Sequence, residues 1–134
     1  MHRPFHPLHA ILLAGTLPLF MGVLLNDVAY AMSSEIQWKN FASWLIVGGL
    51  VFGGFALLGA LIELFHTRPR PFVIVLYPLL LSAMWIVGIV NAFVHAGDAW
   101  ATMPTGLILA AIAAVLASIA TGLRFYMSHA RATV

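Results

Sequence analysis

The stretch FASWLIVGGLVFGGFALLGAL, residues 41 to 61, decides the fold class of this chain. It contains no charged residue and is apolar on every side, whereas a membrane strand would alternate in polarity at every second residue. A helix needs about 20 apolar residues to cross the hydrocarbon core of a bilayer. The stretch is therefore predicted to be a membrane-spanning helix.

The composition of the whole chain of 134 residues also indicates a lipid environment. Hydrophobic residues make up 63% of it and charged residues 7%, against about 25% charged in soluble domains. Cysteine is absent, which excludes disulfides, zinc–thiolate sites, iron–sulfur clusters and covalently attached haem. The net charge of +2 gives no reason to expect nucleic acid as a partner, and the lipid bilayer is the expected surrounding.

Charged residues divide the chain into four long uncharged stretches, residues 4–26, 40–62, 71–97 and 99–123. We predict one all-α domain over residues 1–134, an integral membrane four-helix bundle with helices at about 7–31, 41–65, 72–94 and 105–127. Breaker residues agree with these limits, because the intervening turns contain Pro69, Pro71, Gly97 and Pro104.

Basic residues predict the orientation of the bundle. With four spans, both ends of the chain and the turn between the second and third helices lie on one side, and they hold Arg3, Arg68, Arg70, Arg124 and Arg131. The other side has only Lys39. The positive-inside rule then predicts a multi-pass membrane protein with both termini in the cytoplasm.

Small residues predict close helix packing. The second helix carries Gly49, Gly53, Ala56 and Ala60, and the fourth carries Ala110, Ala114, Ser118 and Gly122. At spacings of three or four residues, each set shares one helical face and lets a neighbouring backbone approach closely.

One group of ionisable residues falls near the predicted cytoplasmic boundary: His6, His9, Glu63, His66 and Arg124. His6 and His9 are three residues apart, as are Glu63 and His66, so each pair shares a helical face. Facing histidines can ligate haem b, which makes His66 with His6 or His9 a candidate pair. In the alternative, the histidines are hydrated at headgroup level and Glu63 pairs with Arg124 or Arg68. A metal site is not expected, because Glu63 is the one inward carboxylate here.

The third helix carries the clearest single stripe, which consists of Tyr77, Leu81, Met84, Gly88, Asn91 and His95. In a functional interpretation, a haem or quinone ring lies against Gly88 and Met84, with His95 as ligand or hydrogen-bond donor. In a structural interpretation, Gly88 admits a neighbouring helix, while Asn91 and His95 bond to Asp27 on the first helix. The structural interpretation is the favoured one.

Short motifs over nearly the whole chain resemble a known family. They are His6-Pro7-Leu8, Asn26-Asp27-Val28-Ala29-Tyr30, Gly59-Ala60-Leu61-Ile62-Glu63, and Thr121-Gly122 followed by Phe125-Tyr126 and His129. The chain is similar to domain-of-unknown-function family twenty-two thirty-one, which consists of small, predicted four-helix bacterial membrane proteins. It departs from the family pattern in having Glu63 at a position that usually holds aspartate.

The resemblance implies a redox setting, because members are similar to modules found beside cytochrome c domains and PQQ-dependent dehydrogenases. We therefore expect an inner-membrane accessory subunit of a periplasmic redox system. It would anchor a dehydrogenase or cytochrome, with electron transfer to quinone through haem b as a further expectation. The chain is not expected to be a catalyst on its own. The alternatives are a cofactor-free structural or interaction protein, including a homo-oligomer, and an oligomeric small transporter or channel.

Overall fold

The computed structural model describes residues 7–97 and 99–132, and every regular element in that part of the chain is a helix. The long helices are α1 (Pro7–Ser33), α2 (Ile36–His66), α3 (Phe72–Ala96) and α5 (Thr105–Ala132). A single short helix, α4 (Ala99–Thr102), lies between α3 and α5. The four long helices are long and apolar enough to cross a membrane, as the sequence predicts.

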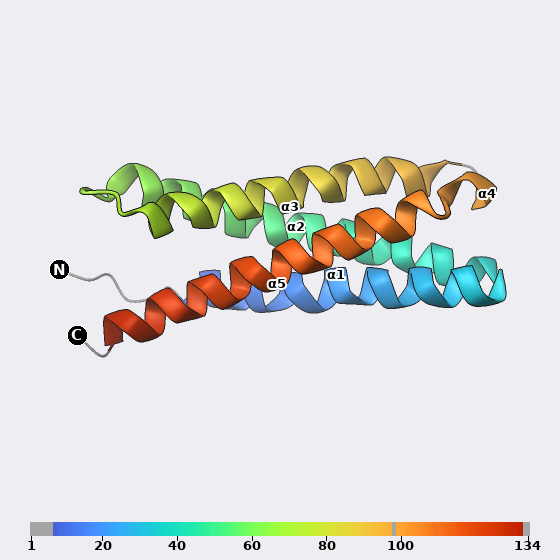
Figure 1. Cartoon of the computed structure of the whole chain (residues 1–134), viewed down its shortest axis with the longest axis horizontal. Coiled ribbons are helices and arrows are strands. Elements are labelled where there is room, and N and C mark those ends of the chain that lie inside the picture. The colour runs from blue at the N-terminus through green and yellow to red at the C-terminus, as the bar shows by residue number, and fades with distance from the viewer. Residues whose placement is uncertain (1–6, 98, 133–134) are drawn as a thin grey trace.

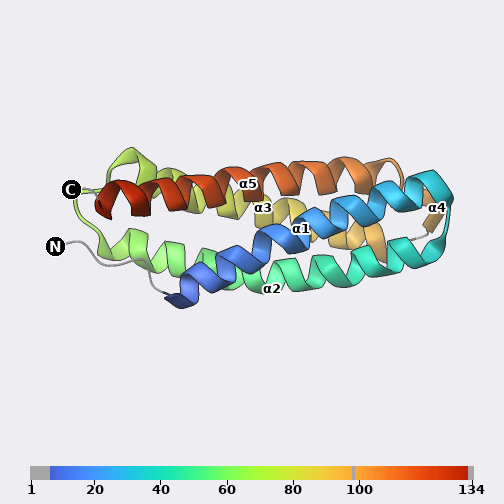
Figure 2. The same ribbon diagram turned by 90° about the horizontal axis from the view of Figure 1, so that it is seen from below.

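The long helices run side by side along one axis (Figures 1 and 2). α1 packs against α2 and α5, and α3 packs against the same two helices. α1 and α3 therefore lie diagonally opposite in the bundle. The end at which α1 begins, α2 turns into α3 and α5 finishes is called the α2–α3 end below, and the opposite end is called the α4 end.

The helices are longer than predicted: α5 ends at Ala132 instead of Met127, and α2 begins at Ile36 instead of Phe41. The connection from α1 is thereby reduced to Ser34 and Glu35. Ser34 has a positive φ of 61°, and the Ser33 hydroxyl accepts a hydrogen bond from the Glu35 amide at 3.2 Å. Because this turn reverses the chain within two residues, no long polar loop is needed between α1 and α2, and residues 36–40 can be part of the helix.

The interior faces of the four helices repeat with alternating steps of three and four residues, the spacing of a left-handed bundle. On α1 the buried residues are His9, Leu13, Thr16, Phe20, Val23 and Asp27, and on α2 they are Lys39, Ala42, Ile46, Gly49, Gly53, Ala56 and Ala60. On α3 they include Tyr77, Leu81, Met84, Gly88, Asn91 and His95. Large side chains thus come mainly from the α1–α3 diagonal, while α2 presents mainly glycine and alanine.

The small-residue stripe predicted for the last helix is only half right. Ala110 and Ala114 are buried, whereas Ser118 and Gly122 are exposed on the outside of the bundle. Strict four-residue steps drift around a helix of 3.6 residues per turn and leave the interior face. The interior face of α5 also contains Gly106, Ala113, Ala117, Ala120, Arg124 and Met127.

Candidate functional site

Two clusters of polar side chains close the interior of the bundle, one at each end. The α2–α3 cluster consists of His9, Glu63, Tyr77 and Arg124, with one residue from each long helix. The α4 cluster consists of Asp27, Asn91, His95 and Thr102. Buried core residues such as Leu13, Phe20, Leu81 and Met84 lie between them along the interior faces.

In the α2–α3 cluster, Arg124 is the central residue. Its Nη1 donates to Glu63 Oε2 at 2.7 Å, and its guanidinium carbon lies 5.3 Å from the centre of the Tyr77 ring. The Tyr77 hydroxyl is hydrogen-bonded to His9 Nε2 at 2.8 Å. Arg124 is only 6% exposed, so the ion pair and the ring contact compensate a cation that has largely left water.

In the α4 cluster, His95 is held from two sides. Its Nε2 lies 2.8 Å from Asp27 Oδ1, and its Nδ1 lies 3.0 Å from the backbone carbonyl oxygen of Asn91. Asp27 and His95 are 0% and 2% exposed. Asp27 Oδ2 and Asn91 Oδ1 are buried without a hydrogen-bond partner among the described residues. Thr102 of α4 covers this end, with its hydroxyl 3.5 Å from the carbonyl oxygen of Val94.

The two clusters hold α1 and α3 in one register. His9 and Tyr77 are 68 residues apart in sequence, and so are Asp27 and His95. The two bonds are separated by 18 residues on each helix, or about 27 Å at the helical rise of 1.5 Å per residue. That length is close to the thickness of the hydrocarbon core, about 30 Å. The diagonal pair is therefore fixed at two levels whose separation is close to the thickness of the hydrocarbon core.

The place proposed for a flat ring beside Gly88 is occupied by side chains. A Cβ atom on Gly88 would lie 2.9 Å from Leu50 Cδ2 and 3.2 Å from Phe20 Cζ. Met84 also points inward, since its Cε would lie 2.9 Å from a Cβ placed on Gly53. Gly88 and Met84 thus serve close packing of α3 against α1 and α2, which is the structural interpretation of this stripe.

The histidines proposed as haem ligands are not brought together. His9 is buried against Gly59 of α2 and bonds to Tyr77, whereas His66 is exposed and its Nδ1 lies 2.8 Å from the carbonyl oxygen of Ile62. His95 belongs to the cluster at the opposite end of the bundle. His6 lies outside the described residues. Of the two partners expected for Glu63, the structure pairs it with Arg124.

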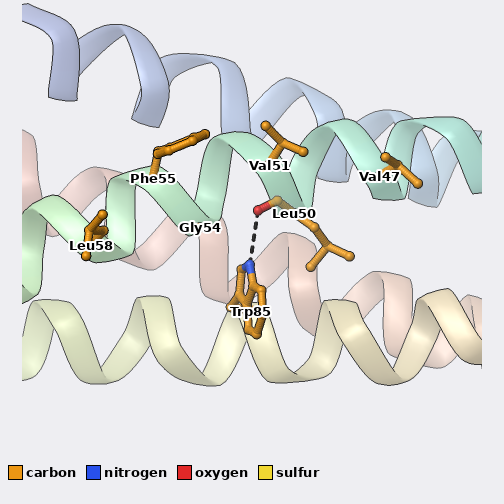
Figure 3. Close-up of a pocket in the computed structure, with 7 residues that line it drawn as sticks. All are labelled: Val47, Leu50, Val51, Gly54, Phe55, Leu58 and Trp85. Carbon is orange, nitrogen blue, oxygen red and sulfur yellow. Dashed lines mark hydrogen bonds between the residues drawn. The ribbon is translucent and has the colours of Figure 1, made fainter.

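Sequence reasoning missed a groove on the outside of the bundle, between α2 and α3 (Figure 3). It has a volume of about 530 Å³ and is lined by Val47, Leu50, Val51, Gly54, Phe55, Leu58 and Trp85. The Trp85 indole nitrogen donates to the backbone carbonyl oxygen of Leu50 at 3.0 Å, which ties the two helices together. A tryptophan in the middle of a span, with a polar atom to satisfy, is the signal that indicates such a bond.

The side chains of both clusters join different helices to one another. Each interior histidine uses its Nε2 to reach a side chain of the diagonal helix, so neither presents that nitrogen to a ligand. Among the described residues proposed for a haem or quinone, His9 and His95 bond to other helices, and Met84 and Gly88 pack against neighbouring helices. The described residues contain no group of three or more His, Asp or Glu side chains placed to hold a metal ion.

The fold and both clusters define a four-helix integral membrane protein with an interior of tightly packed apolar residues and polar ends. A family model described as "Predicted membrane protein (DUF2231)" matches residues 5–130, and the chain belongs to this family. No curated protein and no solved structure matches the chain. The family assignment agrees with the resemblance found in the sequence motifs.

The bond between α1 and α3 at the α2–α3 end can be tested by removing one oxygen atom. Tyr77→Phe is expected to destabilise the bundle by about 1 kcal/mol, the usual size of a hydrogen bond between membrane helices. Tyr126→Phe is the matched control, because Tyr126 is 68% exposed, and it should leave stability unchanged. Unfolding in mixed micelles of increasing denaturing detergent measures both. Equal stability of Tyr77→Phe and the parent protein would contradict the role of the bond.

Proposed function

We propose that this protein is an accessory subunit that anchors a periplasmic dehydrogenase or cytochrome in the bacterial inner membrane. Anchoring is supported by how the interior polar groups are bonded. Each of three pairs joins two different helices: His9–Tyr77, Asp27–His95 and Glu63–Arg124. A bundle tied together in this way offers a partner its outer and end surfaces. The class of partner follows from the resemblance, because similar modules are found beside cytochrome c domains and PQQ-dependent dehydrogenases.

Electron transfer through a haem b between the proposed histidines gains no support from the packing. His9 and His95 would each have to give up a bond to the opposite helix, and a ring beside Gly88 would have to displace Phe20 and Leu50. Anchoring requires none of these changes. The proposed function is therefore attachment of a redox partner. A Soret band in the purified protein would show that haem is bound, which electron transfer through this chain requires.

A partner in the periplasm would meet the α4 end if the termini are cytoplasmic, as the basic residues predict. The connection between α1 and α2 presents apolar side chains there, since Met32 is 84% exposed and Ile36 is 47% exposed. At the opposite end, Phe72 is 74% exposed. These positions allow a pair of matched substitutions, each of which places a carboxylate at one boundary of the bundle.

The test compares Met32→Glu with Phe72→Glu in cells that lack the natural copy of the gene. Membranes are separated from periplasm, and PQQ-dependent dehydrogenase activity and c-type cytochrome are measured in both fractions. We expect one of these partners to be in the membrane fraction with the parent protein and with Phe72→Glu, and to move to the soluble fraction with Met32→Glu and with no protein.

Three outcomes would contradict the proposal. If neither partner changes fraction when the protein is absent, the protein does not anchor it. If Phe72→Glu releases the partner and Met32→Glu does not, the α2–α3 end faces the periplasm and the predicted orientation is wrong. If the protein purifies from native membranes with only copies of itself, the cofactor-free structural alternative replaces anchoring.

A further inference from the structure

The two ring nitrogens of His95 both face oxygen atoms. Nδ1 lies 3.0 Å from the Asn91 carbonyl oxygen, and Nε2 lies 2.8 Å from Asp27 Oδ1. A carbonyl oxygen only accepts hydrogen bonds, so Nδ1 must carry a hydrogen atom. In a neutral imidazole, the other nitrogen is then an acceptor with a lone pair.

The contact of 2.8 Å between Nε2 and Asp27 Oδ1 also needs a hydrogen atom. Without one, the nitrogen lone pair would face a carboxylate oxygen at hydrogen-bond distance. The hydrogen belongs either to His95, which makes an imidazolium beside a carboxylate, or to Asp27, which makes a neutral imidazole beside a carboxylic acid. Both states contain one proton more than a neutral histidine with an ionised aspartate, and both have zero net charge.

We infer that the Asp27–His95 pair is a proton-binding site, loaded with one proton when the bundle is folded. Burial supports the assignment, because Asp27 is 0% exposed and an isolated carboxylate in that position would be costly. The partnerless Oδ2 atom supports it as well. An ionised carboxylate gathers donors at both of its oxygens, whereas a pair without net charge needs fewer.

The groups around the pair come from every helix at this end. α1 contributes Tyr30, one turn beyond Asp27, and α3 contributes Asn91. α4 and α5 contribute Thr102 and Gly106, and a Cβ atom on Gly106 would lie 2.9 Å from His95 Cε1.

The charged side chain that α2 directs to its interior face at this end is Lys39, which is 9% exposed and makes no ion pair with a described carboxylate. Asp98 lies outside the described residues. The extra proton is placed on the pair by the two hydrogen-bond contacts of His95, and the test must read those atoms directly.

The proton is coupled to helix packing, because the hydrogen atom between Nε2 and Oδ1 is the bond that joins α1 to α3 at the α4 end. Without the extra proton, one ring hydrogen would remain for two oxygen contacts, so either the bond to Asp27 or the bond to the Asn91 carbonyl oxygen would be lost. The extra proton is what allows His95 to make both bonds at once.

The test reads the protonation of His95 in the intact protein, reconstituted in lipid bilayers at neutral pH. Val94–His95 is the only valine–histidine step in the sequence, so ¹³C-carbonyl valine with ¹⁵N-histidine selects the backbone signal of His95 and assigns its ring without a substitution. Solid-state NMR then reports which ring nitrogens are protonated. Infrared spectroscopy reports whether Asp27 has the carbonyl band of a carboxylic acid, which Asp27→Asn would abolish.

We expect a protonated Nδ1 together with either a protonated Nε2 or an Asp27 carboxylic acid band. An unprotonated Nδ1 together with an ionised Asp27 would overturn the inference, because the pair would then lack the extra proton. Exposed His66 is the internal reference, since its Nδ1 also faces a carbonyl oxygen and it makes no ion pair with a described carboxylate. If Asp27→Asn fails to fold, the ring signals of the unmodified protein still decide the question.

Discussion

His95→Ala is expected to destabilise the bundle by about 3 to 5 kcal/mol, the usual cost of removing one partner of a buried ion pair. The variant leaves the Asp27 carboxyl group 0% exposed and without the donor at Oδ1, while Oδ2 has no described partner to begin with. Unfolding in mixed micelles measures the loss.

Two comparisons separate the lost bond from a general effect of the substitution. His66→Ala removes an exposed histidine and should change stability by less than about 0.5 kcal/mol. The double variant Asp27→Leu with His95→Leu should be more stable than His95→Ala, because it leaves no polar group unpaired. A His95→Ala protein as stable as the His66→Ala protein would show that the pair does not hold α1 to α3.

Gly88→Leu is expected to destabilise the protein by about 3 kcal/mol, at the upper end for an overpacked core. A Cβ atom alone would lie 2.9 Å from Leu50 Cδ2 and about as close to the edge of the Phe20 ring, and the rest of the side chain has to fit there too. Phe20 cannot move away easily, because its ring also packs on Gly49 and Gly53 of α2. Thermal unfolding in detergent or lipid nanodiscs provides the measurement.

Gly122→Leu is the matched control, because a Cβ atom on Gly122 meets nothing within 4 Å. It should leave the protein at least as stable as the parent, since leucine forms helices better than glycine. The double variant Phe20→Ala with Gly88→Leu should lose less stability than the sum of the two single variants, because each change makes room for the other. A stable Gly88→Leu protein would mean that the space beside Gly88 is empty, and would reopen the case for a flat ring there.

Much of the α4 cluster could be inferred from the spacing of side chains along the third helix. Steps of three and four residues place Tyr77, Gly88, Asn91 and His95 on one face, and the structure buries all four. The bond from His95 to Asp27 also follows from the cost of leaving either group alone in a membrane. The partner of the Trp85 indole nitrogen could not be inferred, because the Leu50 backbone carbonyl that accepts its hydrogen bond leaves no mark in the sequence.

The sequence by itself determined that this protein lies in a membrane and crosses it with four helices, because the cost of burying charge in lipid is a property of each residue and its immediate neighbours. Only the tertiary structure decided which face of α5 looks inward along its whole length. Its span is apolar on every side, so lipid solvates one face as well as another, and the predicted stripe leaves the interior at Ser118 and Gly122. The interior positions Ala113, Ala117 and Ala120 depend on how closely the neighbouring helices can approach them.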